Sequence, residues 1–164
     1  MAIDLNFELT TDKSTLQVCA KMMSESEPWI TLKRNYNDCM SAVQGDNKEV
    51  YIAKNNLTIV GFAVLQMSGT FKGYIQSICI DPGKRGQGIG FALLKFCEGR
   101  IFQTSPNVFM CVSSFNTKAA KLYADLGYKE IGELKDFIVR GHSEILLRKT
   151  IGTISEYSKE NMPY

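Results

Sequence analysis

The stretch Ile78-Cys79-Ile80-Asp81-Pro82-Gly83-Lys84-Arg85-Gly86-Gln87-Gly88-Ile89-Gly90 organises the fold that this sequence predicts. Its first three residues suit the end of a strand that is covered on both faces. The Asp-Pro-Gly that follows ends the strand, because proline cannot donate to a neighbouring strand and glycine supplies unusual dihedrals. Apolar residues then recur at helical spacing up to Ile101, so we expect a helix from about Gly88.

The bend between this strand and this helix is suited to a phosphate. The first amides of a helix have no internal partners, and the helix dipole places partial positive charge at the same end. Three glycines allow another molecule to approach the backbone, and Arg85 adds a forked, permanent positive charge. The sequence therefore predicts phosphate or pyrophosphate binding at residues 85–90, although a tight glycine turn with an unrelated arginine would show the same pattern.

Two common nucleotide-binding motifs do not fit this bend. A P-loop requires Lys and then Ser or Thr after its last glycine, whereas Phe91 and Ala92 follow Gly90. A Rossmann fingerprint starting at Gly86 would need glycine at position 91 and an acidic residue near position 110, and the chain has neither. Both motifs are excluded.

Length and composition indicate a single domain over residues 1–164. The chain has 164 residues, with 45% hydrophobic and 22% charged residues, which is ordinary for a globular protein. Its net charge of +2 is too small to indicate a nucleic-acid or membrane partner, and we expect neither. The 5 cysteines form no CxxC pair, so we expect no metal site, and reduced thiols together with the lack of a signal-peptide pattern suggest a cytoplasmic protein.

Hydrophobic periodicity divides the chain into alternating strands and helices. We expect strands at residues 3–9, 50–53, 59–67, 74–80, 108–112, 128–134 and 143–148. We expect helices at residues 14–23, 31–43, 88–101 and 116–126, and a polar tail over residues 153–164.

Two motifs resemble those of the GCN5-related N-acetyltransferase (GNAT) family. The pattern Arg85-x-x-Gly88-x-Gly90 after a strand is similar to the family's acyl-CoA-binding motif. The segment from Asn116 to Tyr128 is similar to its second signature, in which an Asn and a Tyr two helical turns apart face the cofactor. Spacing alone would equally allow Asn116 to be a helix cap and Tyr123 a core aromatic. Both motifs occur in the family's order, and the resemblance extends to about Thr150.

The resemblance implies the fold, the cofactor and a set of site residues. The fold would be a mixed α/β (α+β) GNAT fold, with a mostly antiparallel sheet of about seven strands flanked by about four helices. The co-substrate would be acetyl-CoA, with no metal. By resemblance, backbone groups of Ile78, Cys79 and Ile80 pair with the pantetheine arm, which Asn116 also holds, and Tyr123 is the catalytic general acid for the departing thiolate. The pyrophosphate would be held by Arg85, Gly86, Gln87, Gly88, Ile89 and Gly90.

The acceptor is a separate question, because one scaffold of this kind serves many acceptors. We expect N-acetyltransfer to the primary amine of a small molecule by direct attack on the thioester. A protein acetyltransferase for lysines or N-termini is the alternative, and so is a non-catalytic acyl-CoA-binding module. A homodimer is compatible with the resemblance. Trp29, between the first two helices, is either a hydrophobic anchor or part of the acceptor pocket.

The general base is the least defined part of the site. Many relatives carry a glutamate on the fourth strand, where this chain has Gln76, and some protein N-terminal acetyltransferases carry one on the fifth strand, where it has Cys111. The lack of both carboxylates argues against an enzyme that acts on protein N-termini, and it leaves the base unassigned. We therefore expect the amine's proton to leave through a water that Gln76 helps to place. The other ionisable groups that could serve are Glu25, Glu27, His142 and Glu144, each of which we expect to be a solvated surface group.

Overall fold

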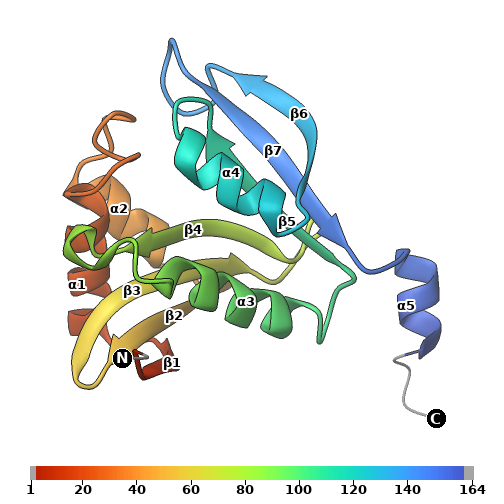
Figure 1. Ribbon diagram of the computed structural model, residues 1–164, viewed down its shortest axis with the longest axis horizontal. Coiled ribbons are helices and arrows are strands. Elements are labelled where there is room, and N and C mark those ends of the chain that lie inside the picture. Colours follow the sequence, from red (N-terminus) through yellow and green to blue (C-terminus); the bar gives the residue numbers. More distant parts are fainter. Residues whose placement is uncertain (1–2, 161–164) are drawn as a thin grey trace.

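The computed structural model describes residues 3–160, which form one seven-stranded sheet with helices on both faces (Figure 1). The strands are β1 Leu5–Thr10, β2 Lys48–Asn55, β3 Thr58–Gln66, β4 Tyr74–Ile80, β5 Asn107–Ser113, β6 Lys129–Lys135 and β7 Ser143–Thr150. The helices are α1 Lys13–Ser24, α2 Tyr36–Val43, α3 Ile89–Ile101, α4 Thr117–Asp125 and α5 Ile154–Glu160, with a short 3-10 turn at Pro82–Lys84.

The sheet has the order β1-β2-β3-β4-β5-β7-β6, and every neighbouring pair is antiparallel except β4 and β5. The mixed, mostly antiparallel sheet expected from the sequence is therefore confirmed. The parallel pair arises because α3 carries the chain from the end of β4 back to the start of β5.

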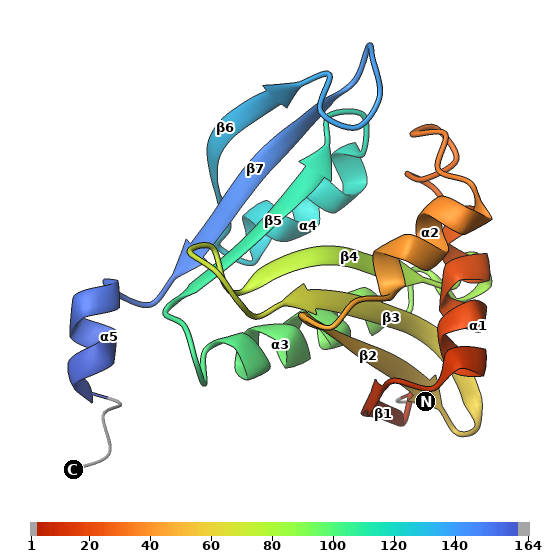
Figure 2. The same ribbon diagram turned by 180° about the vertical axis from the view of Figure 1, so that it is seen from behind.

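Two hydrophobic cores lie on opposite faces of the sheet. Ala63 and Leu65 of β3 pack toward α3 and α4, whereas Phe62 and Val64, one residue out of phase, pack toward α1 and α2 (Figure 2). All four are fully buried, and burial of a large apolar side chain contributes roughly 1.5–3 kcal/mol. The cysteines are free thiols, four of them buried and Cys111 half-buried.

Strands β4 and β5 pair only over a short stretch near their beginnings. Their register contains two pairs, Tyr74 with Phe109 and Ile75 with Met110, after which the strands diverge (Figure 1). At the point of contact, a Cβ atom on Gly73 would overlap the carbonyl oxygen of Asn107, so only glycine fits there. The facing backbone groups of Gln76–Ile80 and of the last residues of β5 are left without a partner strand.

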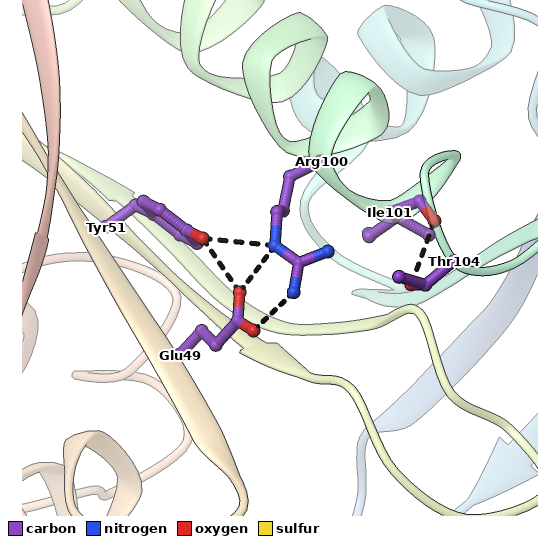
Figure 3. Close-up of polar contacts among 5 residues, drawn as sticks. All are labelled: Glu49, Tyr51, Arg100, Ile101 and Thr104. Atoms are coloured by element: carbon purple, nitrogen blue, oxygen red, sulfur yellow. Dashed lines mark hydrogen bonds and ion pairs between the residues drawn. The ribbon is translucent and has the colours of Figure 1, made fainter.

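An ion pair fixes the end of α3 against β2. Arg100 donates from Nε and Nη2 to the two carboxylate oxygens of Glu49, at 2.9 and 2.6 Å, and the Tyr51 hydroxyl joins both groups (Figure 3). The forked geometry is the strong form of this interaction, and Glu49 raises the pKa of Arg100. One turn later, the Thr104 hydroxyl bonds the Ile101 carbonyl, 3.3 Å away, where the helix ends.

The helix expected over residues 31–43 begins later than predicted, at Tyr36. Asn35 caps it in a reciprocal capping box with Asp38, and this cap fixes the start. Residues 25–33 instead form successive turns, in which the Glu27 carboxylate accepts from the backbone amide and hydroxyl of Thr31.

The polar tail is also corrected, because residues Ile154–Glu160 of it form α5. Thr153 and Glu156 exchange hydrogen bonds at its start, and the Tyr157 hydroxyl donates to the Phe102 carbonyl at 2.8 Å. The part of the tail beyond residue 160 lies outside the described residues. With α5 the described chain has five helices rather than about four.

Candidate active site

A cavity of about 460 Å³ lies between the glycine-rich bend and α4. The bend supplies one wall, from Lys84 to Phe91, and α4 supplies the other, from Asn116 to Asp125. Ile78 and Ile80 of β4 form its floor, and Glu27 and Pro28 of the α1–α2 connection close one end.

The first turn of α3 faces this cavity with unoccupied amides. The residue before the helix, Gly88, has a φ of 80° and no side chain to cap it. A non-glycine residue rarely adopts this dihedral, and a longer side chain there would occupy the space that an approaching ligand needs. Helix geometry leaves the amides of Ile89, Gly90 and Phe91 without intrahelical partners, so this end of the helix attracts an anion.

Positive side chains surround the cavity. Arg85 donates to the carbonyl oxygens of Ile80, at 3.3 Å, and Glu27, at 3.2 Å, so it links the end of β4 to the α1–α2 connection. Lys84, Lys118 and Lys121 add three more positive charges to the lining, against the carboxylates of Glu27 and Asp125. The lining therefore favours a ligand with several negative charges.

Tyr123 lies at the inner end of the cavity with 8% of its surface exposed. Burial raises its pKa to about 12, so the phenol stays protonated at neutral pH and acts as a hydrogen-bond donor. Its ring packs edge-on against Tyr128 at 6.1 Å, which fixes its orientation. Asn116 caps α4 by accepting from the Ala119 amide at 3.3 Å, and it also lines the cavity.

A second, smaller cavity of about 80 Å³ lies between the diverging strands. Its lining comes from the α1–α2 connection, from β4, from β5 and from α4. Trp29 is half-buried and packs against the α1–α2 core, as a hydrophobic anchor does, and it also lines this cavity. Four residues line both cavities, namely Pro28, Ile78, Asn116 and Tyr123. The two cavities therefore meet beside Tyr123, where β4 and β5 have separated.

Gln76 lines the second cavity, but both ends of its amide are occupied. It is the extra residue of a bulge in β4, since Ser77 pairs with Val64 and Ile75 pairs with the next residue, Leu65. Its Nε2 donates to the Ala42 carbonyl at 3.0 Å, and its Oε1 accepts from Gln66 at 2.6 Å. Gln76 thus joins β4 to β3 and to the end of α2, which weakens the expectation that it places a water.

Three of the four other candidate bases are accessible to solvent or bonded elsewhere. Glu25 is exposed and forms an ion pair with Lys21, and the carboxylate of Glu27 is engaged by Thr31. His142 is half-buried and packs edge-on against Phe115, with ring centroids 5.0 Å apart.

Glu144 does not behave as the surface charge that the sequence suggested. It has 4% of its surface exposed, and one carboxylate oxygen accepts from the Ser113 hydroxyl at 2.6 Å. Burial raises the pKa of Glu144, and the Ser113 hydrogen bond opposes this only in part. The prediction was wrong because the neighbouring Arg140 and Gly141 form an exposed turn, whereas Glu144, three residues after Gly141, lies inside β7 and pairs with Ser113 of β5.

The structure brings most of the predicted site residues together at the larger cavity: Ile78, Ile80, Arg85, Gly86, Gly88, Ile89, Gly90, Asn116 and Tyr123. Gln87 does not line it, and the Cys79 side chain points into the opposite core, which leaves only its backbone for the site. Sequence reasoning did not identify Lys84, Lys118, Lys121 and Ser113. Their residue types are ordinary for a turn, an exposed helix face and a strand end, so no sequence pattern distinguishes them.

Comparison with known proteins identifies the class. Residues 14–128 match the model of the acetyltransferase (GNAT) family, so the chain belongs to that family. No curated protein has a matching sequence. The chain is thus an acetyltransferase whose acyl donor is acetyl-CoA.

Solved structures share the fold at low sequence identity. A GNAT-family protein from Desulfovibrio desulfuricans has a TM-score of 0.75 and 16% identity, covering 91% of this chain and 100% of that one. The ribosomal-protein-S18-alanine N-acetyltransferase from Escherichia coli has a TM-score of 0.74 and 18% identity, covering 98% and 100%. The protein yncA from Salmonella typhimurium, solved with its cofactor acetyl-CoA, has a TM-score of 0.68 and 13% identity, covering 90% and 94%.

Two further observations concern residues 3–160 only. Nowhere in this range do three or more His, Cys, Asp or Glu side chains gather as ligands for a metal ion. None of the helices described there combines the length and the hydropathy that crossing a membrane requires.

Proposed function

We propose that this protein transfers the acetyl group of acetyl-CoA to the primary amine of a small molecule by direct attack on the thioester. The observation that carries the proposal is the meeting of two cavities at Tyr123. One is large, basic and lined by helix-terminal amides, and the other is small and lies between separated strands.

The larger cavity suits the coenzyme. The pyrophosphate would lie on residues 85–90, against the first amides of α3 and the Arg85 guanidinium, with lysines nearby for the remaining phosphate charge. The pantetheine arm would run toward Tyr123 between the unpaired backbone edges of β4 and β5, past Asn116. This arrangement is the one that the family resemblance predicts.

The thioester would then lie where the cavities meet. The unpaired amides of β4 near Ile78 offer donors to the thioester oxygen, where negative charge develops during attack. Tyr123 would give its proton to the departing sulfur, since its phenol is protonated and lies at this junction. A module that only binds acyl-CoA would not need such a donor, and this favours the enzyme.

The size of the second cavity favours a small acceptor. At about 80 Å³ the second cavity is much smaller than the first, at about 460 Å³, and a small primary amine suits it. Enzymes of the same fold act on both kinds of acceptor: the S18-alanine enzyme acts on a protein, and nourseothricin acetyltransferase, with a TM-score of 0.59, acts on a small molecule. The absence of a carboxylate from β4 and β5 is our second reason to prefer the small amine.

An acceptor screen tests this proposal. Thiol release from acetyl-CoA is followed with small primary amines in one set and with peptides bearing free N-termini or lysines in the other. We expect turnover with members of the amine set and little with the peptides. Turnover with peptides alone would make the protein alternative correct, and tight acetyl-CoA binding by calorimetry without thiol release in either set would favour the non-catalytic module.

A further inference from the structure

We propose that Ser113 and Glu144 form a proton relay that carries a proton away from the attacking amine. This inference rests on the proposed function and assigns the general base that the sequence left open. Ser113 would touch the acceptor and is the catalytic residue of the pair, and Glu144 acts through it as a positioning residue and proton store.

The geometry of the pair supports a relay. Ser113 lines the second cavity together with Tyr123, and Glu144 lies directly behind it on β7. The two residues are partners in the β5–β7 register, so the sheet fixes their separation and the Ser113 hydroxyl points at the carboxylate. Their 2.6 Å hydrogen bond is in the short range typical of a hydroxyl that donates to a carboxylate. An amine in the cavity would therefore meet a hydroxyl already aligned to pass its proton on.

Burial without a counter-ion distinguishes this carboxylate among the described residues, because Glu98 is equally buried but forms ion pairs with Lys95 and Lys149. Ser113 and Glu144 are each 4% exposed, and among the described residues no lysine or arginine forms an ion pair with Glu144. A desolvated carboxylate without a counter-ion is a stronger base than an exposed one. Within residues 3–160, no lysine or arginine lines the second cavity, so the carboxylate also attracts an acceptor in its ammonium form.

The surroundings of Glu144 contain few other titrating groups. Tyr74 from β4 and Cys111 from β5 lie close enough for the charge of Glu144 to raise their pKa values further than burial alone does. His142 lies just before β7, and the partner of Glu144 on β6 is Leu134, which does not ionise. Because both Tyr74 and Cys111 keep their protons at neutral pH, Glu144 is the group in this cluster able to accept one.

The proton balance is complete without another reagent. The ammonium group gives one proton to Ser113 Oγ while the Ser113 proton passes to Glu144, which leaves a neutral amine and a carboxylic acid. The amine nitrogen attacks the thioester carbon, and the carbon–sulfur bond breaks as Tyr123 gives its proton to sulfur. The nitrogen then loses a second proton, which restores Tyr123, and Glu144 releases the first proton to water.

The chain contains a matched control pair. Ser143 donates to Glu133 at 2.7 Å on the neighbouring strands, but Glu133 is exposed and neither residue lines the two cavities. Glu133→Gln and Ser143→Ala therefore make the same chemical changes outside the site.

The experiment compares two amines of similar size, ethylamine and 2,2,2-trifluoroethylamine. Ethylamine is charged at neutral pH and needs a base to remove its proton. The fluorines of trifluoroethylamine lower the basicity of its amine, so that this amine is already neutral. We expect Glu144→Gln and Ser113→Ala each to lower kcat for ethylamine by about 10²-fold and to change kcat for trifluoroethylamine little. The double variant should be no slower than the slower single variant, because both changes remove one relay. The two control variants should match wild type.

The outcomes distinguish a failure of the relay from a failure of the proposed function. If the site variants lose equal activity with both amines, or if the two losses multiply, the pair is structural and the relay is wrong. The same holds if Glu144→Gln turns over ethylamine like wild type. Unchanged acetyl-CoA affinity and a cooperative thermal unfolding transition show that a variant is folded, and Glu144→Asp provides a carboxylate for partial rescue if Glu144→Gln does not fold. Failure of wild type to release thiol with any acceptor overturns the proposed function itself.

Discussion

The two cavities that meet at Tyr123 are built in different ways. The larger one takes a whole wall from one continuous stretch, residues 84–91, and offers its ligand backbone amides and glycines. The smaller one takes side chains from separate strands and from the α1–α2 connection, with a buried carboxylate behind it. A site made of backbone forces glycines into the sequence at fixed spacing, whereas a site assembled from side chains leaves no such pattern. The difference also predicts that cofactor-side changes act on affinity and acceptor-side changes act on turnover.

Tyr123 should give the largest effect, because it belongs to both cavities. Tyr123→Phe keeps the ring that packs on Tyr128 and removes the hydroxyl, so acetyl-CoA affinity should be nearly unchanged. Turnover should fall by about 10²–10⁴-fold, the usual contribution of a general acid. Steady-state kinetics together with calorimetry measure both quantities. If kcat stays at the wild-type value, Tyr123 is a core aromatic only.

The glycine-rich bend should show the opposite behaviour, a loss of affinity. Gly88→Val places a β-branched residue at a φ of 80° and a side chain in the proposed place of the pyrophosphate, so acetyl-CoA affinity should fall by more than about 10²-fold. Arg85→Ala should lower it less, by at least about tenfold, since a charge-assisted hydrogen bond contributes roughly 1.5–3 kcal/mol. Gly99→Val is the control, because Gly99 lies on the exposed face of the same helix with open space around it. Equal calorimetric affinities for Gly88→Val, Arg85→Ala and wild type would remove the bend from the binding site.

The smallest effect is on stability and concerns the buried carboxylate. The pKa of Glu144 is raised above its ordinary value of 4.5 in the folded protein, so at a pH between the ordinary and the folded value the folded state holds a proton that the unfolded state has released. Its contribution to the free energy of unfolding is therefore highest below the ordinary value and is lost as the pH rises through the folded pKa. Glu144→Gln removes this loss, so its melting temperature should exceed that of wild type by a few degrees at about pH 8 and match it near about pH 4. Glu133→Gln should show no such pH-dependent difference, and melting curves across this range decide the point.

The sequence predicted the sheet and the bend that lines the larger cavity for a shared reason. Buried strands such as β3 carry apolar residues on both faces, and the bend at residues 85–90 needs glycines, so both leave local patterns. The position of Glu144 depends instead on the register between β5 and β7, which places it beside Ser113. Register is a long-range property of the sheet, and nothing in the residues around Glu144 indicates it.

The sequence carries local signals for the starts of α2 and α5, neither of which the apolar periodicity predicts. Asn35 and Asp38, and likewise Thr153 and Glu156, have the spacing of a capping box, and each pair lies at the start of a helix in the structure. An apolar stripe indicates which face of a helix is buried, but the cap determines where the helix begins. Reading the caps first would have placed the start of α2 correctly and would have revealed α5.

The short contact between β4 and β5 has a mechanical consequence. The sheet consists of two parts, β1–β4 and β5–β7–β6. Strand pairing joins these parts through only two residue pairs, between β4 and β5. In the proposed binding mode, acetyl-CoA lies between the unpaired edges of β4 and β5. The acyl donor therefore also links the two parts of the sheet. A ligand at one hundred times its Kd stabilises the folded state by about 2.7 kcal/mol, and here the contacts that supply this energy would cross the shortest strand pairing in the sheet. We therefore expect the two parts of the sheet to be held together more firmly with the coenzyme bound than without it.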